Sequence, residues 1–196
     1  MTVITKSRLE AFSDAVLAIV ITIMVLELKI PHDASLSSLA PLLPVFLSYV
    51  LSFIYLAIYW NNHHHMMLTV HHVNGAILWA NMHLLFWLSL IPFSTGWMGE
   101  NNFAAAPTAL YGIVLLMAAI AYFILQFVIV AEHGKTSVLA TALGKDIKGK
   151  ISPLLYIAGI VSSFFCQWCA AAIYALVALL WLVPDRRIEK ALSKKT

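Results

Sequence analysis

The first long apolar run, residues 8–30, constrains the fold more than any other part of the chain. Its sequence is RLEAFSDAVLAIVITIMVLELKI. About 20 apolar residues rising ~1.5 Å each cross a hydrocarbon layer of ~30 Å, so a helix over this run is long enough to span a bilayer. The run carries no small-residue cleavage site of the kind that ends a secretory signal, and we expect it to remain in the mature protein.

One face of this helix has an unusual composition. At ~100° per residue, Asp14 points away from a face that holds one basic residue, one hydroxyl and a series of bulky apolar side chains. We call this face the stripe, and its members are Arg8, Phe12, Ala15, Ile19, Thr22, Ile23, Leu26 and Ile30. A face of this kind is suited to line a narrow pore.

The rest of the chain repeats the apolar pattern. The 196 residues are 62% hydrophobic and 11% charged, with a mean hydropathy of +0.89, which is typical of an all-α integral membrane protein and not of a soluble domain. We predict one transmembrane domain over residues 1–196. Its six predicted spans cover approximately residues 9–30, 39–60, 76–97, 108–131, 151–166 and 168–184.

The last apolar stretch, residues 151–184, is too long for one span and short for two. A hairpin turning near residues 166–168 places eleven of the twelve Lys and Arg residues on one side of the membrane, with only Lys29 opposite. The excess of basic residues in cytoplasmic loops then makes that side the cytoplasm. We therefore predict a multi-pass protein of the cell membrane with six spans and both termini in the cytoplasm.

A pore along the stripe would need more than one chain. The first helix has no repeat in the second half of the sequence, so the chain is not an obvious internally duplicated transporter. Closed symmetry is the usual solution for soluble and membrane assemblies of identical chains. We expect a homo-oligomer in which each subunit presents the same stripe to a central axis.

Two ionisable residues of the first helix need partners. A charge within a membrane segment costs at least ~2.5 kcal/mol unless it is paired or reaches the interface. Arg8 and Asp14 lie six residues apart, too far round the helix for a direct i,i+4 pair. We expect a network with other helices, in which His83 of the third span is the candidate partner of Ser13 or Asp14. The network either positions the pore or simply joins helices, and the sequence leaves both roles open.

Histidine is concentrated in one part of the chain. Five of the eight histidines lie between His63 and His72, beside Met66 and Met67. Imidazole and thioether groups can bind zinc or copper, but no carboxylate or cysteine completes a ligand set here. We therefore expect a belt of interfacial histidines and no metal site.

The remaining polar residues exclude other classes of function. Cys166 and Cys169 lie within an apolar run without a second Cys or His pair, so we expect them to pack as small hydrophobic residues. No nucleophile and base pair is recognisable, which argues against an enzyme. No basic patch interleaved with aromatics is present, so nucleic acid is not an expected partner.

The start of the first helix also carries a resemblance to a known family. Arg8, Phe12, Ser13 and Asp14 match the R-x-x-x-F-S-D signature of the transmembrane protein 175 family, the endolysosomal potassium channels and their bacterial relatives. The match gains weight from its place at the start of the first of six spans. Two further stretches resemble the family, T-x-x-V-L-E-L at residues 22–28 and YWNNHHHMM at residues 59–67.

This resemblance implies a potassium-conducting homotetramer of the bacterial form, with one six-helix repeat per chain and the first helix lining the central pore. In that family the signature holds helices around the pore, and branched apolar residues further along narrow it. The implied constriction coincides with the stripe and consists of Ile19, Thr22, Ile23 and Leu26. No T-V-G-Y-G segment is present, so a filter of backbone carbonyls is not expected.

Two hypotheses for the function follow. The first is a potassium-selective cation channel with a hydrophobic constriction formed by first-helix residues, with the potassium ion and the lipid bilayer as partners and no cofactor. The alternative is a proton- or cation-coupled secondary transporter that uses Asp14 and the histidine cluster as a relay.

Overall fold

The structure is a computed structural model, and it describes residues 5–134, 136–143 and 147–182. All regular secondary structure in these ranges is helical, which confirms the all-α fold class. The α-helices and one 3₁₀ helix, η1, are α1 (Lys6–Leu26), η1 (Leu36–Leu42), α2 (Leu43–Leu68), α3 (Gly75–Ser89), α4 (Ile91–Glu100), α5 (Ala105–His133), α6 (Val138–Leu143), α7 (Ile147–Ser163) and α8 (Gln167–Leu182).

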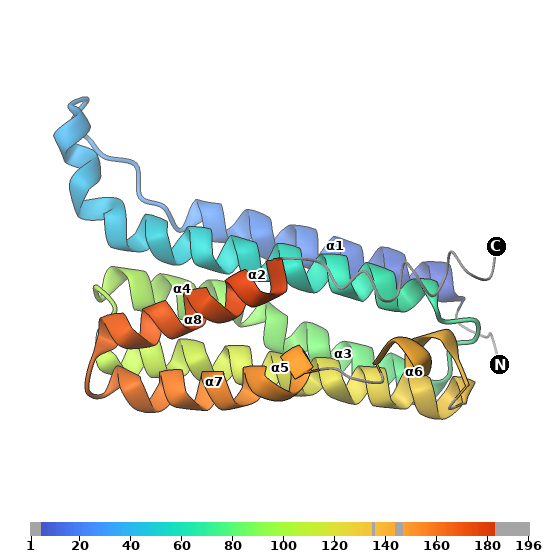
Figure 1. The fold of residues 1–196 in the computed structure, drawn as a ribbon. Helices are drawn as coiled ribbons and strands as arrows, with labels where there is room; N and C mark the ends of the chain where they lie inside the picture. Colours follow the sequence, from blue (N-terminus) through green and yellow to red (C-terminus); the bar gives the residue numbers. More distant parts are fainter. Residues whose placement is uncertain (1–4, 135, 144–146, 183–196) are drawn as a thin grey trace.

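The helices lie side by side in an elongated bundle (Figure 1). α1 and α2 run along one side of the bundle, and α7 runs along the opposite side. We call the end at which α1 begins the near end, and it also holds the α2–α3 turn and α6. The other end, the far end, holds the α4–α5 and α7–α8 turns. α1 packs against α2, α3 and α4, whereas α7 packs mainly against α5 and α8.

Four segments of the described chain are long and apolar enough to cross a membrane. They are Lys6–Leu26, Leu36–Leu68, Gly75–Glu100 and Ala105–His133, and Gln167–Leu182 is a shorter apolar helix. The predicted hairpin of the last apolar stretch is present, because α7 and α8 are separate helices joined at residues 164–166. That both of them cross the bilayer stays a prediction.

The third predicted span differs from the sequence expectation. Residues 76–97 were expected to form one helix, but the chain changes direction at Leu90 and continues as α4. Pro92 lies in the first turn of α4 and has no backbone N–H to continue the hydrogen bonds of α3, which explains the break. Pro is tolerated in the first turn of a helix for the same reason.

Close packing fixes α8 against its neighbours. The buried ring of Tyr174 lies against Gly112 of α5 and Gly159 of α7, where a side-chain Cβ would collide with it. The Tyr55 hydroxyl of α2 donates a hydrogen bond to the Tyr174 carbonyl at 2.6 Å. The last two helices are thus an integral part of the bundle.

Cys166 and Cys169 form a disulfide, contrary to the expectation that they pack as free cysteines. Cys166 is the last residue before α8 and Cys169 lies in the first turn of α8, so their i,i+3 spacing brings the two sulfurs to the same side of that turn. Beside them, the ring of Trp168 contacts Phe103 from the α4–α5 turn, with ring centroids 5.2 Å apart. The disulfide therefore lies at the far end of the bundle.

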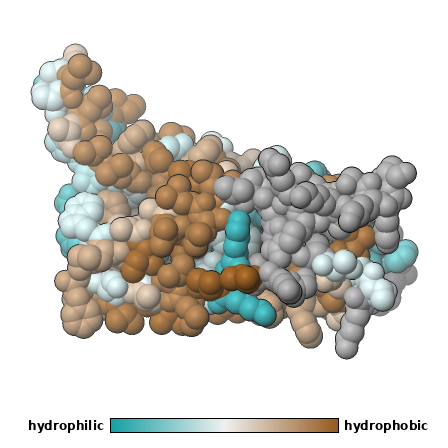
Figure 2. Space-filling model, viewed as in Figure 1, coloured by the Kyte–Doolittle hydropathy of each residue, from teal (hydrophilic) through white to brown (hydrophobic). Residues whose placement is uncertain are grey.

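The outer surface of the bundle is apolar. Figure 2 shows hydrophobic residues spread over the described part of α2 and α8 on the face in view. Large side chains such as Phe127 and Leu179 remain more than 60% exposed in the single chain. Soluble monomers rarely expose apolar surface on this scale, so the surface indicates contact with lipid or with other subunits.

Candidate functional site

α1 is covered on one face only. Its buried residues recur three or four positions apart and pack toward α2, α3 and α4: Leu9, Ser13, Leu17, Val20 and Met24. All eight stripe residues are exposed within the single chain. Ile19 keeps 58% of its surface exposed and Leu26 keeps 76%. The structure therefore leaves uncovered the same face that the helical period singled out in the sequence.

A chain of buried hydrogen bonds fixes the rotation of α1. The Asn81 amide nitrogen of α3 donates to Ser13 Oγ at 2.9 Å, and Ser13 Oγ donates to the Leu9 carbonyl at 2.8 Å. Asn81 Oδ1 lies 2.8 Å from His63 Nε2 of α2. Because the amide oxygen can only accept, His63 carries its proton on Nε2 in this contact. We call these three residues the Ser13–Asn81–His63 chain.

Asp14 makes a second link between α1 and α2. Its carboxylate is exposed and accepts a hydrogen bond from Trp60 Nε1 at 3.0 Å. The Trp60 ring in turn stacks on His64, with ring centroids 6.1 Å apart. Asp14 is on the flank of α1 that faces α2, away from the stripe.

The expected role of His83 is not the one found. His83 Nε2 accepts a hydrogen bond from Trp87 Nε1 of the same helix at 3.0 Å, while Ser13 and Asp14 are bonded by Asn81 and Trp60. Asn81 lies two residues before His83 and therefore points about 160° away from it round α3. Asn81, which sequence reasoning missed, could have been noticed as a lone amide within the apolar run of α3.

The other two signature residues lie at the surface of the single chain. Arg8 and Phe12 are both exposed, and both belong to the stripe. Of the signature, only Ser13 is fully buried. Within the signature, Ser13 is buried, Asp14 links α1 to α2 at the surface, and Arg8 and Phe12 are exposed in the single chain.

The stripe forms one wall of a groove between α1 and α4. Ile19 and Ile23 face Phe93 and Trp97 across it, and the groove is flanked at the far end by Glu27 and Glu100. The far end also carries an ion pair in which Lys29 Nζ donates to Glu100 Oε1 at 2.6 Å. This hydrogen bond raises the pKa of Lys29 above its ordinary value. The groove therefore has an apolar wall and, at its far end, two carboxylates, of which Glu100 is paired with Lys29.

Histidines of the cluster form hydrogen bonds that connect different helices of the bundle. His133 Nε2, at the end of α5, accepts backbone N–H groups from His71 at 3.0 Å and from His72 at 3.3 Å. His63 belongs to the buried chain described above. In the part of the chain that the structure describes, no three His, Cys, Asp or Glu side chains group as a metal site would require.

These features define an all-α, multi-pass membrane protein whose first helix is fixed by buried polar groups and uncovered along one face. A family model described as endosomal/lysosomal potassium channel TMEM175 matches residues 8–92, which begin at the signature and include Asn81. A similar protein, named potassium channel HX13_20290 from Chryseobacterium sp. (strain P1-3), is 58% identical over 190 residues, or 97% of this chain and 99% of that protein.

A second relative and a solved structure are also similar to this chain. Potassium channel Cha6605_3372 from Chamaesiphon minutus is 29% identical over 189 residues, covering 88% of this chain and 91% of that protein. The crystal structure of a lysosomal potassium-selective channel TMEM175 homolog from the same organism superposes with a TM-score of 0.80 at 26% identity, covering 92% of this chain and 97% of that one. The chain belongs to the TMEM175 family, a family of ion channels and not of enzymes.

Proposed function

We propose that this protein is a potassium-selective channel of the cell membrane, with its conduction path at the centre of a homotetramer and the stripe lining that path. The relatives that are named potassium channels support potassium as the permeant ion. The uncovered face of α1 carries the proposal, because a helix that buries Leu17 and Val20 in its own bundle leaves Ile19 and Ile23 for a central axis.

The proposed constriction selects by dehydration. In a tetramer, each of Ile19, Ile23 and Leu26 contributes a ring of four branched side chains around the axis. Narrow apolar rings exclude water, so an ion sheds part of its hydration shell to pass. Potassium gives up that shell more readily than sodium, and a tight ring therefore favours potassium without a carbonyl filter.

Thr22 offers a polar contact within this apolar path. Its hydroxyl donates a hydrogen bond to the Ala18 carbonyl at 2.7 Å, so the proton is directed along the helix and away from the exposed side. The lone pairs of Oγ1 remain available as acceptors. Four such oxygens around the axis would give a partly dehydrated cation a place to rest between the rings.

Charge at the two ends supports an orientation. The near end holds the basic residues Lys6 and Arg8 and the lysines at the start of α7, which favours the cytoplasm. The far end holds the disulfide, and disulfides persist in oxidising compartments outside the cytoplasm. Glu27, which forms no ion pair among the described residues, would then attract cations to the outer mouth.

Planar bilayer recording of the purified protein tests the proposed activity. We expect unitary current steps in potassium and smaller steps in sodium, because a channel passes ions far faster than a carrier. Electroneutral uptake that saturates with ion concentration and never gives unitary steps would instead support the secondary transporter that uses Asp14 and the histidines.

The orientation has a test that uses the native cysteines, which are the only two in the chain. A membrane-impermeant phosphine reductant added outside intact cells should make Cys166 and Cys169 reactive to an impermeant maleimide. The double variant Cys166→Ser and Cys169→Ser measures background labelling. Labelling that requires permeabilised cells would place the far end in the cytoplasm and reverse the proposed topology.

A further inference from the structure

A groove of about 540 Å³ opens at the near end between α5, α6 and α7. Its walls are apolar and include Ile120 and Phe127 of α5, Leu143 of α6 and Pro153 of α7. One cation, Lys150 in the first turn of α7, is exposed at its rim. An apolar groove with a cation at the membrane surface has the two features that an anionic lipid requires.

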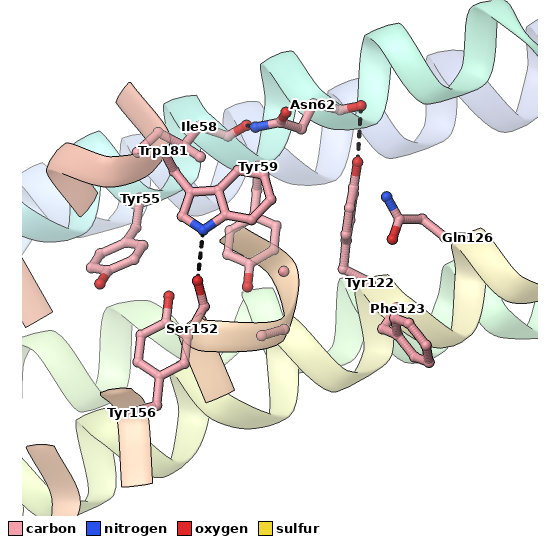
Figure 3. Close-up of a pocket in the computed structure, with 12 residues that line it drawn as sticks. Tyr55, Ile58, Tyr59, Asn62, Tyr122, Phe123, Gln126, Ser152, Tyr156 and Trp181 are labelled. Atoms are coloured by element: carbon pink, nitrogen blue, oxygen red, sulfur yellow. Dashed lines mark hydrogen bonds between the residues drawn. The ribbon is translucent and has the colours of Figure 1, made fainter. Parts of the chain in front are cut away.

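Gln126 provides an independent sign of a ligand. Only 8% of its surface is exposed, and its amide has no hydrogen-bond partner among the residues that the structure describes. It borders both the groove and a small inner cavity of about 60 Å³ (Figure 3). In that cavity Tyr122 donates to the Asn62 carbonyl at 3.2 Å and Ser152 accepts from Trp181 at 2.8 Å. No buried side-chain nitrogen or oxygen of the described residues lacks a hydrogen-bond partner, so the unbonded Gln126 amide is open to the groove that it lines, where a ligand can reach it.

The depth of the two polar groups matches a lipid. Gln126 lies seven residues before the end of α5 at His133, or ~10 Å along the helix axis. With the near end at the membrane surface, as in the proposed orientation, Lys150 in the first turn of α7 is placed in the surface layer, and the headgroup and interfacial regions add ~5–8 Å to each side of the hydrocarbon core. Gln126 is therefore near the boundary where the ester groups of a phospholipid meet its acyl chains.

The groove also lies where lipid can reach it. α7 runs along the side of the bundle opposite α1 (Figure 1), so a tetramer with the stripe at its axis leaves this side outward. Glu132, at the end of α5, accepts a hydrogen bond from Asn74 at 2.6 Å, and Lys150 has no ion pair among the described residues.

We propose that this groove binds one anionic glycerophospholipid of the near-end leaflet. The phosphate contacts Lys150, an ester carbonyl accepts a hydrogen bond from the Gln126 amide, and one acyl chain lies along Phe127 toward Ile120. The proposal goes beyond ion conduction, since it assigns a ligand site on the outer side of each subunit.

Native mass spectrometry of the detergent-purified channel tests the phosphate contact, with phosphatidylglycerol and phosphatidylcholine of identical chains as probes. The wild type should bind phosphatidylglycerol more tightly. Lys150→Gln should weaken phosphatidylglycerol about fivefold, as the loss of one surface cation implies, and should weaken phosphatidylcholine less, because its choline group offsets the charge of the phosphate. Lys6→Gln, which removes the same charge at the same end but outside the groove, is the matched control. Equal affinities of Lys150→Gln and Lys6→Gln would overturn the proposal.

The ester contact is tested separately. Gln126→Leu should weaken both ester lipids about threefold, the usual size of a hydrogen bond between polar groups in a membrane. Binding of the ether-linked analogue, which lacks the carbonyl, should not change. Gln167→Leu at the far end is the matched control. Equal weakening of ester and ether lipids by Gln126→Leu would overturn the assigned contact. Because these measurements need no ion flux, their failure is distinguishable from failure of the channel proposal.

Discussion

Replacing Ile19 with Asn is expected to raise the single-channel conductance and to reduce the preference for potassium over sodium. Beyond the signature, Ile19 is the first stripe residue with a large side chain. It is 58% exposed in the single chain. Four amides in place of four branched side chains would hydrate the ring, so an ion would no longer lose its shell there. A loss of ~1.4 kcal/mol in discrimination corresponds to a tenfold fall in the permeability ratio, and we expect a change of that order.

The control for this prediction is matched in exposure. Ile23, one turn further along the stripe, is 42% exposed, and Val25, on the flank of α1, is 43% exposed. Ile23→Asn should act like Ile19→Asn, whereas Val25→Asn should leave conductance and selectivity unchanged. Potassium and sodium currents recorded side by side from the three variants decide the matter. Unchanged selectivity in both stripe variants would falsify the hydrophobic filter.

The parts of the fold that sequence predicts well are those set by local periodicity. The 3.6-residue period of α1 separates Leu17 and Val20 from Ile19 and Ile23 without any knowledge of the other helices, and burial in the structure follows it. Charge distribution likewise predicted that the last apolar stretch turns back on itself, and α7 and α8 do so. Both patterns are properties of the chain that do not depend on which helices become neighbours.

The expectations that failed depend on how helices rotate against one another. To choose between His83 and Asn81 as the partner of Ser13, one must know the orientation of α3. Side chains two residues apart on a helix point to nearly opposite faces, so only one of the two can reach Ser13. The disulfide depends on the path of a short turn, which composition does not determine. The unpartnered Gln126 is recognisable only when the surroundings of α5 are known.

The buried signature residue Ser13 and the proposed constriction lie close together along α1. Ser13 is anchored to α3 and α2, and Ile19 lies six residues further along α1, ~9 Å along its axis. A helix held at this point cannot rotate freely, so the side chains just beyond it keep a fixed direction. We infer that the buried chain positions the constriction and does not itself contact the permeating ion.

Asn81→Leu should therefore be among the most destabilising single substitutions in the bundle. It leaves His63 and Ser13 buried without their shared partner, and each orphaned polar group costs ~1–3 kcal/mol in a protein interior. Hydrogen bonds in membrane proteins average only ~0.6 kcal/mol, so we take the lower limit for the two orphaned groups. The expected loss in the free energy of unfolding is then ~2 kcal/mol. For a chain of this length that lowers the melting temperature in detergent by ~4–8 °C.

The matched control is His83→Leu, which alters a histidine two residues away on the same helix. Its hydrogen bond to Trp87 stays within α3, so we expect a shift of the melting temperature less than half as large. Fluorescence-detected size exclusion after heating measures both variants and also the yield of assembled channel. Equal shifts would show that Asn81 has no special role in holding α1. Because the network orients the stripe, the Asn81→Leu channels that do assemble should also show a lower potassium to sodium ratio, whereas His83→Leu should keep the wild-type ratio.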